Sequence, residues 1–176
     1  MTLTYQTWSC SHTGRRRAEN SDAIAIGSNV WALADGFGAP DRASEAAGRA
    51  AESTVHHYEK GDAGDSARRL REAVEQANRE VHSLSKSGLE LAGTTLVAAA
   101  VQGQTAYIGG IGRCRAYLIR DRSIQQLTED HTWIAAQIAA GNLTEDEAGD
   151  HPKRNVVTRA LGPEPEVQVD IIRCDL

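Results

Sequence analysis

Two long stretches of the chain repeat apolar and small residues at intervals of three and four positions, the spacing of one face of an α-helix. The first runs from Asp41 to Lys60, and the second follows the segment GDAGDS and ends before Gly88, a good helix terminator. The first stripe is Ala43, Ala46, Ala47, Ala50, Ala51, Thr54, Val55 and Tyr58, and the second is Ala67, Leu70, Val74, Ala77, Val81 and Leu84. We expect these two amphipathic helices to pair.

Most of the other apolar segments alternate with polar residues in steps of two, which is typical of β-strands. TLTYQTW predicts a first strand near the N-terminus. DAIAIGSNVWALAD follows and is broken at Gly27, Ser28 and Asn29, which predicts a hairpin of two strands.

The second half of the chain mixes strands with short helices. Residues 92–128 predict four short strands, HTWIAAQIAAG and TEDEAGD predict short helices, and EVQVDIIRCDL predicts a final strand. Strands, a helix pair and strands again, with antiparallel connections, predict an α+β domain in which helices cover sheet faces. No linker, repeat or low-complexity tract interrupts the pattern, so we expect residues 1–176 to form a single domain.

Composition narrows the class of protein without specifying a function. A chain of 176 residues that is 40% hydrophobic and 24% charged can bury a core as one globular domain. The net charge of -5 argues against general nucleic-acid binding, although the loop GRRRAEN permits a local anion site. The cysteines show neither disulfide-framework nor zinc-site spacing, which favours a reducing cytoplasm. No segment resembles a membrane helix or an export signal, so we expect a cytoplasmic protein that does not contact membranes.

The segment VWALADGFGA runs from a strand into a glycine-rich turn, with Asp35 at the junction. If the hairpin turn centres on Ser28 and Asn29, Asp22 lies opposite Asp35 with the Cβ atoms about 5 Å apart, where carboxylates repel each other. Mg²⁺ or Mn²⁺ would relieve this repulsion, and Gly36 leaves its carbonyl open to a ligand. Alternatively, both carboxylates are solvated turn residues whose repulsion is screened. A three-residue turn would break the pairing.

Six short motifs occur in order along the chain: RAENSDA, WALADGFGA, AGTTLVAA, GRCRAYLI, LTEDHT and HPKRNVVTRALG. Together they resemble the ordered motifs of bacterial type 2C protein serine/threonine phosphatases, from near the N-terminus almost to the last residue. The resemblance implies two packed antiparallel β-sheets flanked by paired helices, which agrees with the α+β prediction. It also implies two Mg²⁺ or Mn²⁺ ions that activate a water to attack the phosphorus of phosphoserine or phosphothreonine.

The resemblance implies roles for particular residues. Asp22 and Asp35 resemble the carboxylates that hold the metal pair, with Asp35 as the bridging, catalytic carboxylate and Gly36 as a carbonyl ligand. Arg17 resembles the arginine that grips the substrate phosphate. Residues from about 128 to 156 resemble a mobile flap where the family varies its substrate contacts. They could also be small helices that shield a sheet edge.

Two departures from the family pattern bear on the metal site. Where the family usually reads Gly-Asp-Ser-Arg, residues 112–115 read GRCR, so Arg113 replaces a carboxylate that often holds an additional metal. We expect Arg113 to pair with Asp35 or Asp22, or to contact an anion or a partner. Family members also continue past EVQVDIIRCDL through strands that supply two more metal-ligating carboxylates. We therefore expect missing C-terminal strands, weak metal binding, and exposed sheet edges that a partner chain or a dimer covers.

Two functions are compatible with this pattern. In the first, the chain is a metal-dependent phosphoprotein phosphatase with weakened activity, whose partner is a phosphorylated protein or its kinase. In the second, it is a catalytically dead pseudophosphatase that binds phosphoproteins or a partner through Arg17, Arg113 and the flap. Among the remaining residues, we expect Asp130 to cap the helix that follows it and Cys114 to be a small core residue in a strand.

Overall fold

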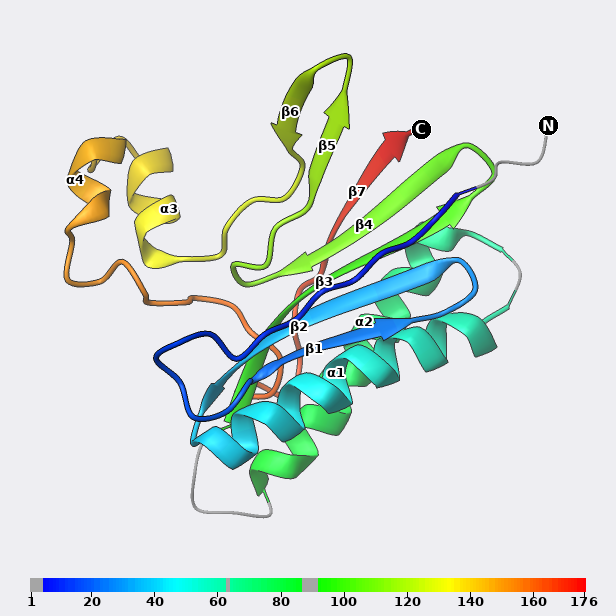
Figure 1. Cartoon of the computed structure of the whole chain (residues 1–176), viewed down its shortest axis with the longest axis horizontal. Helices are drawn as coiled ribbons and strands as arrows, with labels where there is room; N and C mark the ends of the chain where they lie inside the picture. The colour runs from blue at the N-terminus through cyan, green and yellow to red at the C-terminus, as the bar shows by residue number, and fades with distance from the viewer. Residues whose placement is uncertain (1–4, 63, 87–91) are drawn as a thin grey trace.

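The computed structural model describes residues 5–62, 64–86 and 92–176 of the chain. Among these residues, five strands form an antiparallel sheet in the order β1–β2–β3–β4–β7, and β5 pairs with β6 in a separate hairpin (Figure 1). The strands are β1 (Asp22–Ile26), β2 (Val30–Gly38), β3 (Ala92–Gln102), β4 (Thr105–Ile111), β5 (Tyr117–Arg120), β6 (Ser123–Gln126) and β7 (Asp170–Asp175). The helices are α1 (Pro40–Lys60), α2 (Ser66–Lys86), α3 (Trp133–Ala139) and α4 (Glu145–Gly149). The predicted α+β class is confirmed.

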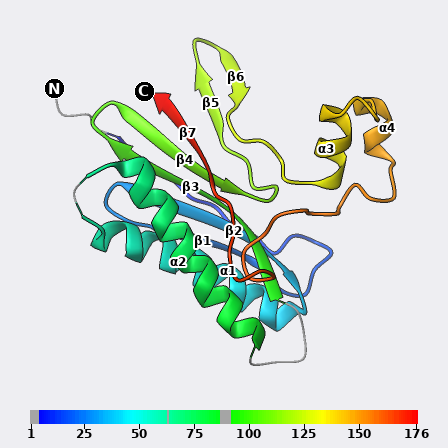
Figure 2. The ribbon, with the colours of Figure 1, turned by 180° about the vertical axis from the view of Figure 1, so that it is seen from behind.

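The two long helices pair as predicted and lie against one face of the five-stranded sheet (Figures 1 and 2). Small side chains allow this close approach, because Ala46, Ala47 and Ala50 of α1 are fully buried against the sheet. The helices also share a polar contact, since Nε2 of His57 lies 3.0 Å from Oε1 of Glu80. The predicted terminator of the second helix, at residue 88, lies outside the described residues.

Alternate residues of the central strands face opposite sides of the sheet, as the two-residue period of a strand requires. The buried positions on the helix side are Val30, Ala32, Ala34, Leu96, Ala98 and Ala100. On β2, the intervening residues Trp31, Leu33, Asp35 and Phe37 are partly exposed. Asp35 therefore points to the face of the sheet opposite the helices.

The β1–β2 hairpin has the two-residue turn that the sequence predicts. The N–H of Gly27 closes the turn by donating to the carbonyl three residues later at 2.8 Å, with Ser28 and Asn29 at the centre. The resulting register places Asp22 directly opposite Asp35. The predicted pairing of the two carboxylates is confirmed.

The two short helices predicted after the four-strand block are present as α3 and α4, which project beside the β5–β6 hairpin (Figure 1). The prediction that Asp130 caps α3 is wrong. Thr132 is the cap, because its hydroxyl accepts the N–H of Ala135 at 3.1 Å. Arg115 instead binds both carboxylate oxygens of Asp130, at 2.8 and 2.6 Å.

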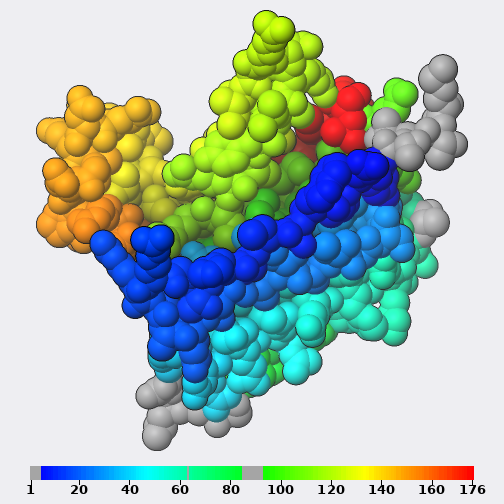
Figure 3. Space-filling view, viewed as in Figure 1, coloured from blue at the N-terminus to red at the C-terminus, as the bar shows by residue number. Residues whose placement is uncertain are grey.

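Two strand predictions need correction. Residues 5–8 of the predicted first strand form no strand, and its start lies outside the described residues. Side chains anchor this segment instead of a backbone ladder: Tyr5 donates its hydroxyl to the carbonyl of Ser28 at 2.8 Å and meets the ring of Trp31 edge-on. Figure 3 shows the segment, in dark blue, running along the front of the molecule. The final strand begins later than predicted, at Asp170, where its pairing with β4 starts.

Several apolar side chains are exposed at the margins of the sheets. Ile26 on the edge strand β1 is 53% exposed, and Ile119 and Ile124 face each other on the β5–β6 hairpin with 74% and 67% exposure. Covering of these margins by a partner chain or a dimer stays a prediction. Within the described residues, the structure contains no helix long and apolar enough to cross a membrane.

Candidate metal and phosphate site

A row of side chains crosses the sheet on the face opposite the helices. The strand registers align Asp22 with Asp35 and Asp35 with Thr95. The turn after β4 then passes close to Thr95, where a Cβ on Gly112 would overlap the threonine side chain. Gly112 also has a φ of 89°, so only glycine fits this turn comfortably. The turn presents Arg113 to the row.

The charge of Asp35 disfavours the ionised form of Asp22. Partial burial raises the pKa of Asp22, and the negative charge of Asp35 raises it further, while the Arg17 guanidinium acts in the opposite direction. A cation beside such a pair relieves the repulsion between the two carboxylates, because it favours their charged form. The observed geometry therefore suits the predicted metal role of Asp22 and Asp35, which itself stays a prediction.

Arg113 partly offsets the repulsion. Its Nη2 lies 3.4 Å from Oδ2 of Asp35, with 44% of the arginine side chain and 37% of the aspartate side chain exposed. Among the pairings that we predicted for Arg113, the structure therefore contains the one with Asp35. An ion pair as exposed as this is worth about 0.5 kcal/mol. A strongly bound cation would outcompete it.

Gly36 has a packing role that the sequence did not reveal. A Cβ at this position would overlap the backbone carbonyl of Ala43 in α1 and lie 3.0 Å from the carbonyl oxygen of Ser21. The N–H of Gly36 donates to that Ser21 carbonyl at 2.9 Å. The absence of a side chain therefore lets α1 begin close to the site, and the metal contact of the Gly36 carbonyl stays a prediction.

Thr95 is a site residue that the sequence reasoning missed. It is buried, and its hydroxyl lies 3.0 Å from Sγ of Cys114 and 3.5 Å from the carbonyl oxygen of Asp35. The prediction that Cys114 lies in a strand is wrong, because it follows the turn after β4. Burial raises the pKa of the Cys114 thiol to about 11, so the thiol is a packing group rather than a nucleophile. Only the register of β2 and β3 reveals the place of Thr95.

A cavity of about 680 Å³ lies beside the row. Its walls come from the N-terminal loop, the end of β2, the turn after β4, and the segment that follows the flap. Arg17, Asp35, Gly36 and Arg113 all line it, and Asp22 stands across the hairpin from Asp35. The structure thus brings together the residues that the sequence singled out from distant parts of the chain.

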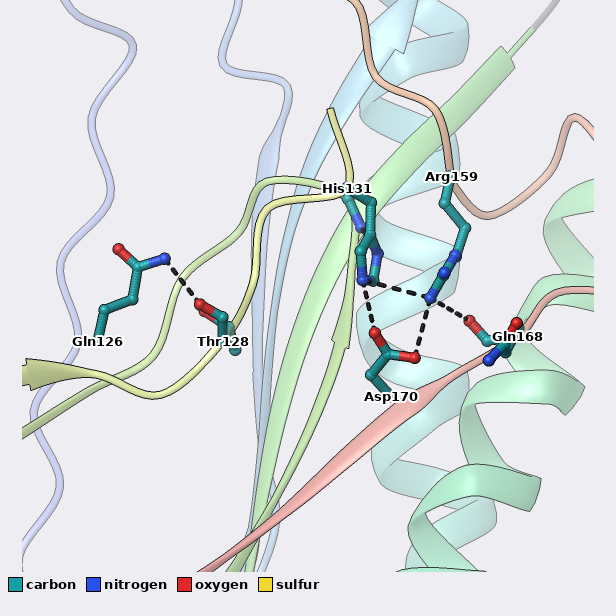
Figure 4. Close-up of polar contacts among 7 residues, drawn as sticks. Gln126, Thr128, His131, Arg159, Gln168 and Asp170 are labelled. Atoms are coloured by element: carbon teal, nitrogen blue, oxygen red, sulfur yellow. Dashed lines mark hydrogen bonds and ion pairs between the residues drawn. The ribbon is translucent and has the colours of Figure 1, made fainter. Parts of the chain in front are cut away.

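A second polar cluster ties both ends of the flap to the sheet (Figure 4). Nε2 of His131 lies 2.8 Å from Oδ2 of Asp170, and Arg159 donates to Oδ1 of the same carboxylate at 2.9 Å. The N–H of Gly112 donates to Nδ1 of His131 at 3.0 Å, so Nε2 carries the proton that is donated to Asp170. The 3.3 Å approach of Arg159 to Nε2 is then not a hydrogen bond, because both groups are donors.

This cluster keeps Asp170 ionised. Burial alone would raise the pKa of Asp170, but the hydrogen bonds from His131 and Arg159 and the positive charge of Arg159 outweigh it and lower the pKa. No spacing in the sequence predicts the cluster, because its members come from the start of the flap, the segment after it and β7. The motif LTEDHT contains His131 but does not indicate its partners.

The flap is internally packed. Trp133 at the start of α3 stacks on His151 with ring centroids 4.8 Å apart, and the ammonium group of Lys153 lies 4.5 Å from the centroid of the tryptophan ring. In α4, the side chains of Thr144 and Glu147 form a capping box. The segment is thus a small compact unit, and its predicted mobility and substrate contacts stay predictions.

The described residues include part of the donor set that the predicted divalent-metal site requires. Asp22, Asp35 and the Gly36 carbonyl are oxygen ligands of the kind that Mg²⁺ and Mn²⁺ prefer. Within the described part of the chain, no three or more His, Cys, Asp or Glu side chains gather to hold a metal. The donor set therefore fits a metal that keeps much of its water.

Comparison with known proteins identifies the family. A family model described as Protein phosphatase 2C matches residues 11–164. The serine/threonine phosphatase stp of Listeria monocytogenes is 36% identical over 103 residues, which are 57% of this chain and 41% of that protein. The serine/threonine protein phosphatase PstP of Mycobacterium tuberculosis is 33% identical over 164 residues, which are 92% of this chain and 32% of that protein. The chain belongs to the protein phosphatase 2C family.

Solved structures agree with this assignment. The serine/threonine phosphatase Stp1 from Staphylococcus aureus matches 94% of this chain with a TM-score of 0.85 and 28% identity, over 69% of its own length. The catalytic domain of PstP in complex with 2 manganese ions matches 94% with a TM-score of 0.80 and 30% identity, over 70% of its own length. The predicted type 2C phosphatase fold is confirmed, and the chain spans less than half the length of the two sequence relatives.

Proposed function

We propose that this chain hydrolyses phosphoserine and phosphothreonine in proteins with the help of Mg²⁺ or Mn²⁺. The observation that carries the proposal is the direct opposition of Asp22 and Asp35 next to a cavity that Arg17 also lines. The names of the relatives, which are serine/threonine phosphatases, support the same reaction. A cytoplasmic phosphoprotein, or the kinase that phosphorylates it, is the partner that this reaction requires.

Asp22, Asp35 and the Gly36 carbonyl would hold the metal, with Asp35 bridging two ions. Bound there, the ions supply a hydroxide at neutral pH and stabilise the negative charge of the phosphoryl group. The relative with two manganese ions supports this cofactor. With only Asp22 and Asp35 converging in the described part of the chain, little negative charge holds the ions. Mg²⁺ gives up its water reluctantly, so we infer weak binding and weakened activity of the 176-residue chain.

The arginines act on the phosphate. Arg17 lies on an exposed loop at the cavity, and its planar guanidinium matches two phosphate oxygens. This contact orients the phosphate and stabilises the charge that accumulates on its oxygens in the transition state. Residues 128–156 form the flap beside this region, and we assign to them the contacts with the peptide on either side of the phosphorylated residue.

A second function, phosphoprotein binding without hydrolysis, is favoured by one observation. Arg113 occupies the position of a family carboxylate and its guanidinium contacts Asp35, the carboxylate that would bridge the metals. If this contact persists in the presence of metal, Arg17 and Arg113 make the cavity an anion-binding site that has lost its catalyst. The chain would then act as a pseudophosphatase.

An assay of phosphate release separates the two functions. The 176-residue chain is incubated with a phosphothreonine peptide, with and without Mn²⁺, beside Asp35→Asn. Asp121→Asn is the matched control, because it makes the same isosteric change in the β5–β6 turn. The proposal predicts Mn²⁺-dependent release that Asp35→Asn reduces at least about 100-fold, the usual effect of losing a catalytic group. Asp121→Asn should release phosphate at the wild-type rate.

The opposite result is equally clear. If the folded wild-type chain releases no more phosphate with Mn²⁺ than without it, hydrolysis by this chain is contradicted. Binding of the same peptide, measured by fluorescence anisotropy, would then support the pseudophosphatase.

A further inference from the structure

The guanidinium of Arg113 contacts an oxygen atom of Asp35, which is one of the proposed metal ligands. The guanidinium of Arg113 lies 3.4 Å from Oδ2 of Asp35, and both residues line the cavity. The two carboxylates of the hairpin face each other, so a single positive charge at Asp35 reduces their mutual repulsion. The metal-free site therefore already contains a cation that belongs to the chain.

The fold holds this cation in place through the turn that carries it. Gly112 and His131 make two hydrogen bonds with each other. The backbone N–H of Gly112 donates to Nδ1 of His131 at 3.0 Å, and the backbone N–H of His131 donates to the Gly112 carbonyl at 2.8 Å. Asp170 then fixes the imidazole from its other side at 2.8 Å. Arg113 is therefore attached to a braced turn rather than to a free loop.

The other arginines near the site are placed differently. Arg115, two residues further along the chain, is bound by both carboxylate oxygens of Asp130. Arg17 acts on Asp22 by its charge, from the N-terminal loop, which also lines the cavity. Among the arginines of the described residues that line the cavity, Arg113 is the one that forms an ion pair with Asp35.

We propose that Arg113 is an internal counter-ion of the Asp22–Asp35 pair, which stabilises the metal-free site and which a divalent ion must displace from Asp35. The inference rests on the proposed function, because it concerns the same metal site. The arginine opposes metal binding. This chain therefore needs a higher metal concentration to fill the site than a chain with the same two carboxylates and no counter-ion.

Isothermal titration of Mn²⁺ into the wild-type chain, Arg113→Ala and Arg115→Ala tests the inference. Arg115→Ala is the matched control, because it removes the same charge two residues further along the chain, from a different carboxylate partner. Removing one positive charge about 6 Å from a divalent ion in a water-like medium should lower the Kd about tenfold. We expect this change for Arg113→Ala and a much smaller change for Arg115→Ala. An unchanged or higher Kd for Arg113→Ala would overturn the inference.

A measurement without metal tests the other half. Urea unfolding of Arg113→Ala, Asp35→Asn and the double variant forms a double-mutant cycle in the presence of a chelator. The inference predicts that Arg113→Ala lowers the urea midpoint in the wild-type background and leaves it unchanged beside Asp35→Asn. Equal shifts in both backgrounds would mean that the guanidinium does not stabilise Asp35, and would overturn the inference.

These results separate the inference from the proposed function. Equal Mn²⁺ affinity in the wild-type chain and Arg113→Ala, together with Mn²⁺-dependent phosphate release, overturns only the inference. Mn²⁺ binding by Arg113→Ala alone supports the inference and contradicts metal-dependent hydrolysis by the native chain. A lack of binding in all three proteins overturns both.

Discussion

At the scale of single residues, the site consists of groups that are costly to place together. Asp22 and Asp35 face each other across a hairpin, although like charges at opposed positions destabilise a strand pair. Gly36 and Gly112 occupy positions where a side chain would overlap another segment of the same chain. A destabilising pair of carboxylates usually serves function, whereas the two glycines permit close packing. Substitutions at these residues should therefore separate effects on function from effects on stability.

The carboxylate pair should destabilise the metal-free chain. Because the pKa of Asp22 is raised in the folded state, its ionised form is disfavoured there. The penalty is present above the raised pKa and disappears below the unfolded value of 3.8. We therefore expect Asp22→Asn to raise the free energy of unfolding at pH 7 by about 0.5 kcal/mol and to leave it unchanged near pH 3. Urea unfolding with a chelator at both pH values measures this, and a loss of stability at pH 7 would contradict it.

Gly36 offers a test with a matched glycine. Gly36→Ala places a methyl group into the carbonyl of Ala43, so it should destabilise the chain by about 3 kcal/mol. Gly48, in the middle of α1, has nothing within 4 Å of its missing Cβ. Gly48→Ala should therefore stabilise the chain by about 0.5–1 kcal/mol. Thermal unfolding followed by circular dichroism compares the two, and equal effects would mean that the close approach of α1 is not required.

At the scale of elements, the flap is joined to the sheet at both of its ends by one carboxylate. Asp170 on β7 accepts from His131, which precedes α3, and from Arg159, which follows the flap. His131 also braces the turn that carries Arg113. The same cluster therefore positions the flap and one side of the cavity, without belonging to the proposed metal site.

Charge removal at this cluster should loosen the flap in a pH-dependent way. The lowered pKa of Asp170 means that its ionised form stabilises the folded state above the ordinary value of 3.8, and that this contribution is lost as the pH falls through the lowered pKa. Discounting for the 38% exposure of its side chain, we expect Asp170→Asn to cost about 1 kcal/mol at pH 7, with the difference from the wild type shrinking as the pH falls below 3.8.

Limited proteolysis gives an independent view of that prediction. Cleavage between residues 128 and 156 should become faster in Asp170→Asn at pH 7. Asp175→Asn is the control on the same strand, because Asp175 is 75% exposed and pairs with Arg173, which is 67% exposed. Equal cleavage rates in the two variants would show that Asp170 does not hold the flap.

At the scale of the whole molecule, the sequence predicted the features that depend on residues close together in the chain. The opposition of Asp22 and Asp35 follows from the two-residue turn between them, so the sequence was sufficient to predict it. The same holds for the paired helices, whose stripes repeat along each segment. The ion pair of Arg113 with Asp35 was among the alternatives because the motif placed both residues at one site.

The remaining features depend on partners that are distant in the chain. Thr95 joins the row only through the pairing of β2 with β3. His131 meets Asp170 across 39 positions of sequence, which no periodicity signals. The predicted first strand failed because alternation describes a strand but does not provide the neighbour it needs, and Tyr5 is instead anchored by its side chain. The metal, substrate and partner roles stay proposals at this scale.

The most direct test of the central claim, that the opposed carboxylates hold a catalytic metal, is a crystal structure of the chain grown with MnCl₂, with anomalous diffraction measured at the manganese edge. We predict anomalous peaks between Asp22 and Asp35 and beside the Gly36 carbonyl, with the guanidinium of Arg113 moved away from Asp35. Arg113 still bound to Asp35, with no manganese peak at the hairpin at millimolar Mn²⁺, would contradict the metal site and leave the cavity as a place for anion binding.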